Sequence, residues 1–371
     1  MGLFWRPAPV TLLPGKRFLC EVFGTGTALA GQNDRIRRTQ RMAGKFVTVF
    51  GGSGFIGRHV VRHLAAQGWR VRIAVRDIEE AGFLRTAGNL GQISAIATTI
   101  ADDASVAAAV KGADAVINLV GVLYERGKRT FQALHVDGAR RIAEAARAAG
   151  ATHLVHVSAL GADANSPSKY ARSKAAGEAA VHGAFPGATI FRPSVVFGAE
   201  DHFFNMFGCL AQISPVLPYF TDITPHTPGG GGAKFQPVFV GDVAEAIAAS
   251  VTGETHKGRS YELAGPKVYD MFEVLTIVNR ETMRKRAIWG MPYLFAHIKA
   301  AFLQFLPTPL LTPDQVKLLK LGSVASGRAP GLEAFGIAAT PVELVVPTYL
   351  KRFRPVQQTK KIRAGGKLGA H

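Results

Sequence analysis

The stretch Val47-Thr-Val-Phe-Gly-Gly-Ser-Gly-Phe-Ile-Gly57 decides the fold, and it runs directly into Arg58-His-Val-Val-Arg-His-Leu64. An apolar run typical of a buried strand ends in three spaced glycines, and a helical pattern begins at once. Gly51 permits a tight turn, Gly54 lets a pyrophosphate approach the backbone, and Gly57 lets the helix lie close to the strand. Free N–H groups and the positive end of the helix dipole would face the phosphates. The pattern predicts a dinucleotide-binding turn.

Strand-like and helix-like patterns alternate from residue 45 onward. A second apolar run, Arg70–Val75, follows the glycine turn at the spacing of a Rossmann unit, which disfavours a purely structural glycine turn. Further strands are expected at Gln92–Ala97, Ala115–Asn118, His153–Ser158, Ala188–Arg192 and Phe235–Val240, and helices at Phe55–Gln67, Ser105–Val110, Phe131–Ala149, Tyr170–Gly183 and Val243–Val251. The chain is therefore predicted to be an α/β protein with a Rossmann-type doubly wound parallel sheet.

The length of 371 residues suffices for this sheet and a second, smaller unit. We expect a flexible N-terminal extension over residues 1–44 and an NAD(P)-binding Rossmann domain over 45–264. A smaller, mostly helical C-terminal lobe is expected over 265–350, followed by a basic tail over 351–371. With 47% apolar and 19% charged residues the chain is a folded protein, and its two cysteines fit a reducing compartment.

The net charge of +18 lies mainly at the two ends of the chain. Residues 45–278 carry 22 basic and 20 acidic side chains, whereas residues 279–371 carry 15 and 4. The tail 351–371 holds seven basic residues and no acid. Such an end predicts an acidic protein surface or anionic lipid headgroups as partner, with a merely solvated tail as the alternative. Nucleic acid is disfavoured because no nucleic-acid module is visible.

No segment has the unbroken apolar length of a transmembrane helix, since prolines, His297 and Lys299 interrupt the nearest candidate, 287–311. Residues 1–41 are poor in acid and contain arginine, which suggests a mitochondrial presequence, but they lack serine; a true start at Met42 is an equal alternative. No metal site is predicted, because the five histidines between residues 59 and 156 show no ligand spacing and are interpreted as surface or packing residues.

The residues after the second strand bear on the choice of nucleotide. An acid at this position would bind the ribose 2′-hydroxyl of NAD, but here Arg76 comes first and Asp77 second. An arginine can pair with a 2′-phosphate, and Arg58 can supply a second positive charge. We therefore expect NADP(H), with Asp77 on the ribose of NAD(H) as the alternative.

Two further strand ends are expected to border the cofactor. Asp102 can accept a hydrogen bond from the adenine amino group, or it can cap the helix that follows, for which Asp103 is the better-placed residue. Asn118-Leu-Val-Gly121 ends the fourth strand, and ligands of such sheets bind beyond the carboxyl ends of the strands. Asp242 is interpreted as a helix N-cap and not as a catalytic acid.

Tyr170-Ala-Arg-Ser-Lys174 is the second informative motif, because residues four apart share one helix face. Lys174 would bind the nicotinamide ribose and lower the pKa of Tyr170, which would exchange a proton with a substrate oxygen. Ser158, at the end of the fifth strand, would orient that oxygen. The alternative is a ribose clamp that performs no catalysis.

These motifs, together with Arg192-Pro-Ser-Val-Val-Phe-Gly198, resemble the extended short-chain dehydrogenase/reductase superfamily in its atypical branch. The segments Val116–Gly121, Tyr170–Glu178, Gln236–Val243 and Gly331–Glu343 resemble more narrowly the nucleotide-binding accessory subunits of respiratory complex I, over residues 45–355. The resemblance implies a tightly held NADPH, a peripheral position near the membrane, complex I subunits as partners and a role in assembly or stability. The cofactor-binding residues expected are Gly51, Ser53, Gly54, Phe55, Ile56, Gly57, Arg58, Arg76, Asp102, Leu119, Val120, Gly121, Tyr170, Lys174 and Pro193.

Two functions from different classes remain open at this point. The first is an NADPH-holding accessory subunit at the cytoplasmic side of a bacterial inner membrane, or at the matrix side in a mitochondrion. The second is a free-standing NAD(P)-dependent reductase, epimerase or dehydratase that uses Ser158, Tyr170 and Lys174. A third, weaker hypothesis is a redox sensor that changes partners with NADPH occupancy.

Overall fold

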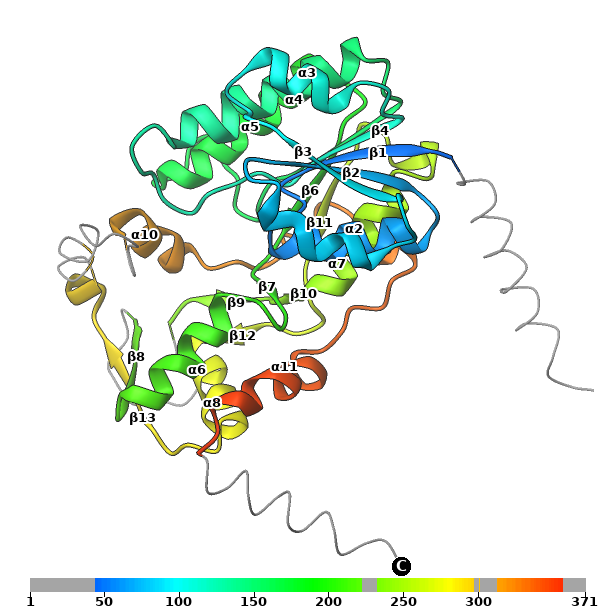
Figure 1. Ribbon diagram of the computed structural model, residues 1–371. Coiled ribbons are helices and arrows are strands. Elements are labelled where there is room, and N and C mark those ends of the chain that lie inside the picture. Colours follow the sequence, from blue (N-terminus) through cyan, green and yellow to red (C-terminus); the bar gives the residue numbers. More distant parts are fainter. Residues whose placement is uncertain (1–43, 222–231, 297–299, 301–311, 356–371) are drawn as a thin grey trace, which may run out of the picture. The chain divides into compact units, whose positions relative to one another are not determined.

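The computed structural model describes residues 44–221, 232–296, 300 and 312–355; the predictions for the N-terminal extension and for the tail beyond residue 355 lie outside these ranges. Seven strands form the main sheet in the order β11-β6-β5-β4-β1-β2-β3, and every neighbouring pair is parallel (Figure 1). They are β1 Phe46–Phe50, β2 Arg70–Val75, β3 Ile93–Ala97, β4 Ala115–Asn118, β5 His153–Val157, β6 Thr189–Pro193 and β11 Ser260–Leu263. The predicted doubly wound parallel sheet is confirmed, and the strand order reverses between β1 and β4, where such sheets bind ligands.

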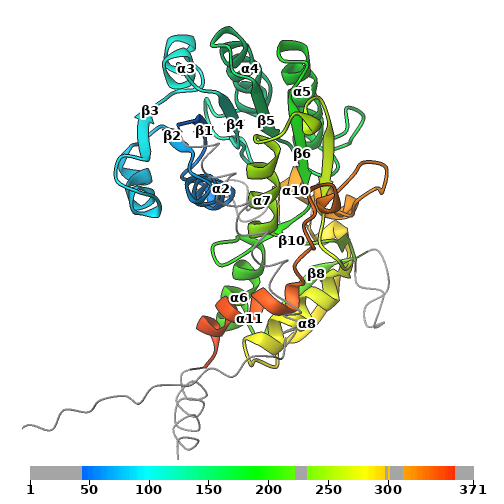
Figure 2. The same ribbon diagram turned by 90° about the vertical axis from the view of Figure 1, so that its right-hand side faces the viewer.

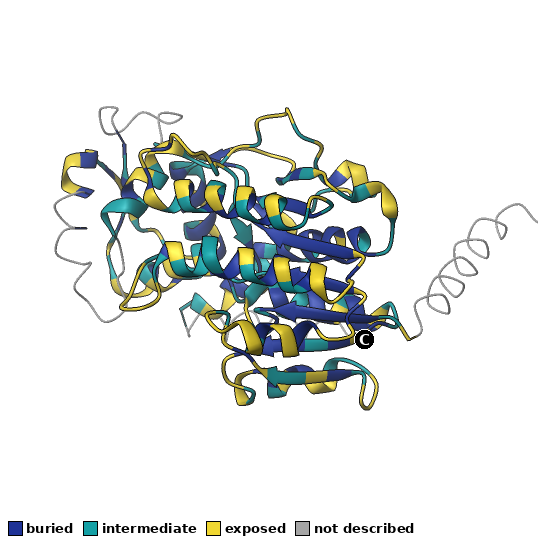
Figure 3. Cartoon of the chain, turned by 90° about the horizontal axis from the view of Figure 1, so that it is seen from above, coloured by how far each residue is buried: buried dark blue, intermediate teal, exposed yellow. Residues whose placement is uncertain are grey.

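Helices cover both faces of the sheet (Figure 2). One face carries α2 Phe55–Ala66 and α7 Val240–Ser250, and the other carries α3 Asp103–Val110, α4 Gly138–Ala148 and α5 Lys169–Ala184. Seen from above, the strands are largely buried, while the outer sides of the helices are exposed (Figure 3). The sheet therefore separates two apolar cores, as expected for a fold of this class.

The alternation of side chains along β1 builds both cores. Val47 and Val49 belong to the core under α2 and α7, while Phe46 and Phe50 belong to the core under α3 and α4. In α2, Val60, Val61 and Leu64 are fully buried against the first of these cores. Burial of each such side chain contributes roughly 1.5–3 kcal/mol, so the sheet and α2 hold the glycine turn between them firmly in place.

The C-terminal lobe has an apolar core of its own. Its helices are α6 Phe203–Ile213, α8 Met271–Glu281, α10 Pro313–Leu321 and α11 Val342–Leu350, and its short strands are β7 Val196–Phe197, β8 Val216–Phe220, β9 Lys234–Phe235, β10 Val238–Phe239, β12 Tyr269–Asp270 and β13 Ala287–Met291. The core packs α6 against α8 and α11. Because α6 and β8 precede residue 265, the lobe is assembled from chain on both sides of β11.

The segment after α10 returns to the Rossmann sheet and ties the two parts together. Leu332 lies in the sheet core, and the Ser326 N–H and hydroxyl donate to the Glu262 carboxylate. Asp242, in the first turn of α7, accepts hydrogen bonds from the Thr340 N–H at 2.7 Å and the Thr340 hydroxyl at 2.8 Å. The expectation that Asp242 caps its own helix is wrong, because Phe239 occupies the N-cap and the carboxylate holds the returning segment instead.

Three of the differences from the sequence expectation concern the sheet and the helices beside it. The strand expected over 235–240 is two short strands, because β9 pairs with β12 and β10 pairs with β7 on either side of Pro237. The helix expected over 131–149 begins with a π-helical turn, Gln132–Asp137, before α4. The edge strand β11 was not anticipated, since only Tyr261 and Leu263 of its four residues are buried.

Candidate nucleotide-binding site

The glycine turn between β1 and α2 has the geometry that close backbone packing demands. Gly51 has φ +75°, a conformation that favours glycine, and its N–H donates to the Ala74 carbonyl at 3.3 Å. A Cβ on Gly57 would lie 2.3 Å from the Gly51 oxygen and 2.7 Å from the Gly52 Cα, so only glycine fits there. Gly54 is the N-cap of α2 and brings no side-chain cap, which leaves the N–H groups of the first helical turn for an anion.

The end of β4 lies against this turn. A Cβ on Gly51 would sit 3.3 Å from the Leu119 carbonyl carbon, so the segment 119–121 faces the turn across the point where the strand order reverses. The Val120 N–H donates to Asn118 Oδ1 at 3.0 Å, and the Val122 N–H donates to His135 Nε2 at 3.0 Å. The predicted residues of these two strand ends therefore come together at the carboxyl edge of the sheet, where the strand order reverses. We call this region the nucleotide crevice.

The charged residues at the end of β2 are divided between a turn and the solvent. Asp77 Oδ1 accepts from the Glu79 N–H at 2.9 Å, so this carboxylate is engaged in a backbone turn. Arg76 is exposed and directly follows the last residue of β2. Arg58 lies over the glycine turn, where its guanidinium donates to the Ser53 and Gly54 carbonyls and sits 3.5 Å from Glu200. Arg58 therefore lies at the glycine turn, and Arg76 follows the neighbouring strand β2.

Asp102 lies after β3 and is the N-cap of α3. Its carboxylate accepts from the Ser105 N–H at 3.0 Å. The expectation that Asp103 is the better-placed cap is wrong, since Asp103 lies within the helix and pairs with Arg141. Capping leaves the second carboxylate oxygen of the exposed Asp102 for another donor, so the proposed adenine contact and the cap are compatible.

Lys174 and Ser158 meet at the end of β5. Lys174 is 4% exposed, and its Nζ donates to the Val157 carbonyl at 2.8 Å, directly before Ser158. The Ser158 hydroxyl is buried and has no hydrogen-bond partner within the part of the chain that the structure describes. Burial lowers the pKa of Lys174 to about 8, with Glu178 acting in the opposite direction, so the ammonium remains mostly charged at neutral pH.

Tyr170 lies one helical turn before Lys174, and its ring packs edge-on against Phe131 and His135. Burial raises the pKa of Tyr170 to about 12. The expected lowering of this pKa by Lys174 is therefore not found, because the shift comes from desolvation of the phenol. At neutral pH the hydroxyl keeps its proton and is a donor.

Comparison with known proteins agrees with this geometry. The model of the NAD dependent epimerase/dehydratase family matches residues 47–264, which include the glycine turn, Ser158, Tyr170 and Lys174. The chain belongs to this family. It is also 34% identical over 315 residues to the mitochondrial NADH dehydrogenase [ubiquinone] 1 alpha subcomplex subunit 9 of Mus musculus, covering 84% of this chain and 81% of that protein, and so belongs with these subunit 9 proteins.

Two other similarities add to this result. A ceramide reductase of Caulobacter vibrioides is 40% identical over 172 residues, which are 46% of this chain and 53% of that protein. An NADPH-dependent quinone oxidoreductase of Escherichia coli, solved with NADPH, superposes with a TM-score of 0.63 at 20% identity, over 82% of this chain and 99% of that chain. The last similarity shows the fold alone. Together with the family match, it identifies the fold of this chain as a nucleotide-binding one.

Two residues at the candidate site, His135 and Asp314, were not predicted from the sequence. His135 accepts from Val122 through Nε2 and contacts the Ser173 hydroxyl through Nδ1 at 2.8 Å, which joins the β4 end to α5. Burial and then Lys174 lower the pKa of His135 to about 3. Asp314, from α10, binds the N-terminus of α5. Neither has a local signal, because each acts on residues distant in the sequence.

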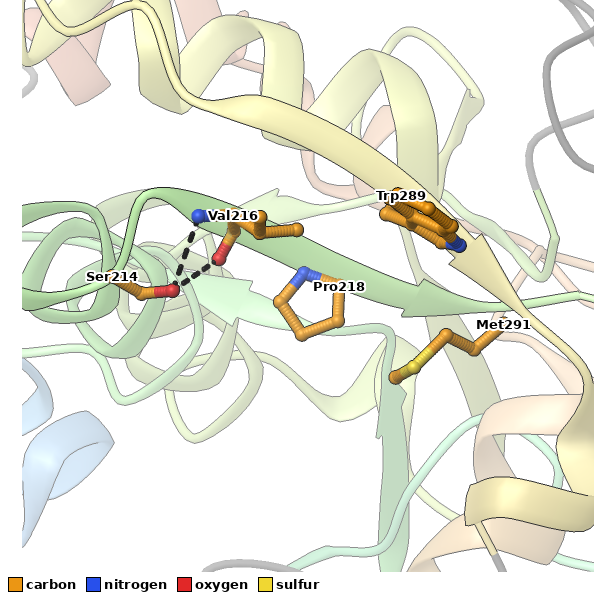
Figure 4. A pocket seen from close by; sticks show the side chains of 5 residues that line it. All are labelled: Ser214, Val216, Pro218, Trp289 and Met291. Atoms are coloured by element: carbon orange, nitrogen blue, oxygen red, sulfur yellow. Dashed lines mark hydrogen bonds between the residues drawn. The ribbon is translucent and has the colours of Figure 1, made fainter.

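A separate hollow of about 300 Å³ lies in the C-terminal lobe, on the two-stranded sheet of β8 and β13. Its lining residues are Ser214, Val216, Pro218, Trp289 and Met291 (Figure 4). Near this hollow Trp289 and Phe295 are each 52% exposed, whereas Tyr293 is buried. The hollow shares no residue with the nucleotide crevice, so it is a feature of the lobe and not of the candidate site.

Within the described ranges, no three metal-ligating side chains lie together, and no helix has the length and apolar content needed to cross a membrane.

Proposed function

We propose that the chain is an NADP(H)-binding accessory subunit of NADH:ubiquinone oxidoreductase, respiratory complex I, and that it supports assembly or stability of that enzyme near the membrane. The observation that carries the proposal is the similarity to a protein named as a subunit of this dehydrogenase over more than four fifths of both chains. The site would act chiefly as a clamp whose bound nucleotide stabilises the fold by mass action. Complex I subunits are the proposed partners, and the cytoplasmic or matrix side of the membrane is the proposed location.

The residues of the crevice fit a dinucleotide. The cradle at Gly57 excludes any side chain, the first turn of α2 offers uncapped N–H groups, and the Ser158 hydroxyl is buried without a partner among the described residues. The preference for NADP(H) is supported by the exposed Arg76, which directly follows β2 where an NAD-binding chain would carry an acid. Asp77 comes one residue later, and its Oδ1 already accepts from the Glu79 N–H. Arg58 is the proposed second contact of the 2′-phosphate.

The test uses the protein at its natural level in its own organism. A tag on the chromosomal copy, purification in mild detergent and mass spectrometry should recover complex I subunits together with bound NADPH. A matched strain carrying Gly57→Val should lose the nucleotide and a large part of the complex. Purification of the wild-type chain alone, with no respiratory subunit, would overturn the proposal.

A reductase is the second candidate function, and one observation favours it. Ser158, Tyr170 and Lys174 are all present, and the Tyr170 hydroxyl is protonated at neutral pH, although its raised pKa makes it a weaker acid than an exposed tyrosine. Bound NADPH would supply a hydride, Tyr170 would protonate the substrate oxygen, and the Ser158 hydroxyl would orient that oxygen. The similarity to a ceramide reductase over half of each chain makes long-chain carbonyl compounds the first substrates to test.

The basic C-terminal region is the proposed contact for anionic lipid headgroups. Lys351, Arg352 and Arg354 begin this region at the end of the described lobe, and residues 351–371 contain no acid. Binding to vesicles with anionic lipid, but not to purely zwitterionic vesicles, is expected to weaken steeply with salt because the attraction is electrostatic. Equal binding to both kinds of vesicle would contradict this contact.

A further inference from the structure

The carboxylate of Asp314 closes the N-terminus of the helix that carries Tyr170 and Lys174. It accepts from the Ser168 hydroxyl at 2.8 Å, the Lys169 N–H at 2.7 Å and the Tyr170 N–H at 3.0 Å. These donors precede it by 144 to 146 residues, and α10 lies beside the end of α5 in Figure 1. One side chain of the C-terminal lobe thus fixes the turn that presents the Tyr170 ring.

This contact completes a cap that α5 provides only in part. The Ser168 hydroxyl, fully buried, accepts from the Ala171 N–H, which leaves the first two N–H groups of α5 without an intrahelical acceptor. Asp314 supplies both acceptors. Asp314 also lies in the first turn of its own helix, α10, whose N-terminus is closed by a capping box of Thr312 and Gln315. A single anion is therefore stabilised by the positive ends of two helix dipoles.

The Asp314 carboxylate links α10 to the nucleotide crevice. Lys174 follows Tyr170 by one helical turn and bonds the Val157 carbonyl beside Ser158, so a shift of the first turn of α5 would move both side chains relative to the β5 end. Lys317 of α10 adds a contact of 3.4 Å to the Pro167 carbonyl on the same loop. The same three hydrogen bonds therefore join α10 to the first turn of α5, which carries Tyr170.

We propose that Asp314 is a positioning residue that couples the seating of α10 to nucleotide affinity at the Tyr170–Lys174 end of the crevice. The inference rests on the proposed function only in that the crevice holds a nucleotide. Because coupling is reciprocal, a partner that holds α10 in place tightens nucleotide binding, and bound nucleotide favours docking through the lobe. The C-terminal lobe thereby senses the occupancy of the crevice.

The test measures NADPH affinity of the full chain by calorimetry and hydrogen exchange of the α10 amides with and without NADPH. Asp314→Asn replaces an acceptor oxygen with a donor group and should weaken NADPH binding by about 5-fold or more. In the wild type NADPH should slow exchange in α10, and in the variant this protection should vanish. The matched control is Asp270→Asn, another N-cap aspartate in the lobe, which should leave both readouts unchanged.

The outcomes separate this inference from the proposed function. Failure of the wild type to bind any nicotinamide nucleotide overturns the proposed function. Wild-type binding of NADPH with unaltered affinity in Asp314→Asn, or with no change in α10 exchange, overturns the coupling alone. If the variant does not fold, the wild type still decides: NADPH should protect the Gln315–Lys320 amides more than the amides of α8. General stabilisation of the fold by bound nucleotide would protect both helices alike and would overturn the coupling.

Discussion

The two ends of the nucleotide crevice are built in opposite ways. The glycine turn is made by residues 51–57, which are consecutive in the chain and lie between one strand and one helix. The Tyr170 end is assembled from β4, the π-helical turn at His135, α5 and α10, which are up to about two hundred residues apart in sequence. The glycine turn, the local end, depends on the backbone conformations of its own glycines. The Tyr170 end, the assembled end, depends on side chains from elements that are distant in the sequence.

Substitution of Gly57 should have the largest effect, because the local end leaves no room for adjustment. In Gly57→Ala the new Cβ would meet backbone atoms at 2.3 to 2.8 Å, so β1 and α2 must separate. We expect a loss of about 1–3 kcal/mol in the free energy of unfolding and a parallel loss of NADPH binding. Urea denaturation and calorimetry provide the measurements.

Gly183→Ala is the matched control for that substitution. Gly183 lies exposed in α5 with no neighbour within 4 Å of an added Cβ, so the change should leave binding intact and raise stability by about 0.5–1 kcal/mol. If both glycine variants bind NADPH like the wild type, the close packing at Gly57 is not what shapes the site.

The contrast between the two ends also explains which parts of the fold and of the site could be predicted from the sequence. The strands Arg70–Val75 and Ala115–Asn118 were predicted to the residue, because each is a short apolar run followed by a turn or a loop. The turn and the Tyr-x-x-x-Lys spacing are local patterns as well. The roles of His135 and Asp314 could not be predicted, because a histidine in a π-helical turn and an aspartate after a proline acquire partners only when the chain has folded.

The assembled end should be sensitive to acid through His135. Burial lowers the pKa of this imidazole from 6.5 to about 3, so the unfolded chain binds a proton at mildly acidic pH that the folded chain does not. The stability that His135 contributes is complete above pH 6.5 and is lost as the pH falls toward 3. Between pH 7.5 and pH 5 we expect a loss of roughly 1–2 kcal/mol from this group.

Urea denaturation at the two pH values measures this loss in the wild type and in His135→Gln. The glutamine retains an acceptor for the Val122 N–H but does not titrate, so the variant should lose less stability on acidification. His156 is also buried with a lowered pKa, and it is present in both proteins. The loss of stability in the wild type must therefore be compared with the loss in the variant, because only the difference reports on His135. Identical pH dependence in the two proteins would show that His135 has the same pKa in the folded and the unfolded chain, which contradicts the prediction.

Substitution of Arg76, at the local end, should have a smaller effect that concerns only the binding of NADPH. Arg76→Ser should weaken NADPH binding by about 10-fold and leave NADH binding unchanged, because the guanidinium would contact only the 2′-phosphate. Arg85→Ser removes the same charge from another exposed position and is the control. Equal loss of affinity for both nucleotides, or an equal effect of the Arg85 variant, would remove Arg76 from the specificity site and favour Asp77 on a ribose hydroxyl.

Tyr170→Phe should have the smallest effect on the protein itself while dividing the two proposed functions most sharply. Among the described residues the Tyr170 hydroxyl has no hydrogen-bond partner, and its ring contacts with Phe131 and His135 would persist in phenylalanine. Stability should therefore stay within about 0.5 kcal/mol of the wild type.

A clamp needs the fold of α5 but no proton donor, so the variant should still support assembly of the respiratory enzyme. A reductase needs the donor, so oxidation of NADPH by a long-chain carbonyl substrate would cease in the variant. If the variant strain has normal complex I and even the wild type shows no carbonyl-dependent oxidation of NADPH, only the accessory role remains. If the wild type has a reductase activity that the variant loses, Tyr170 is a catalytic residue and the assembled end is an active site.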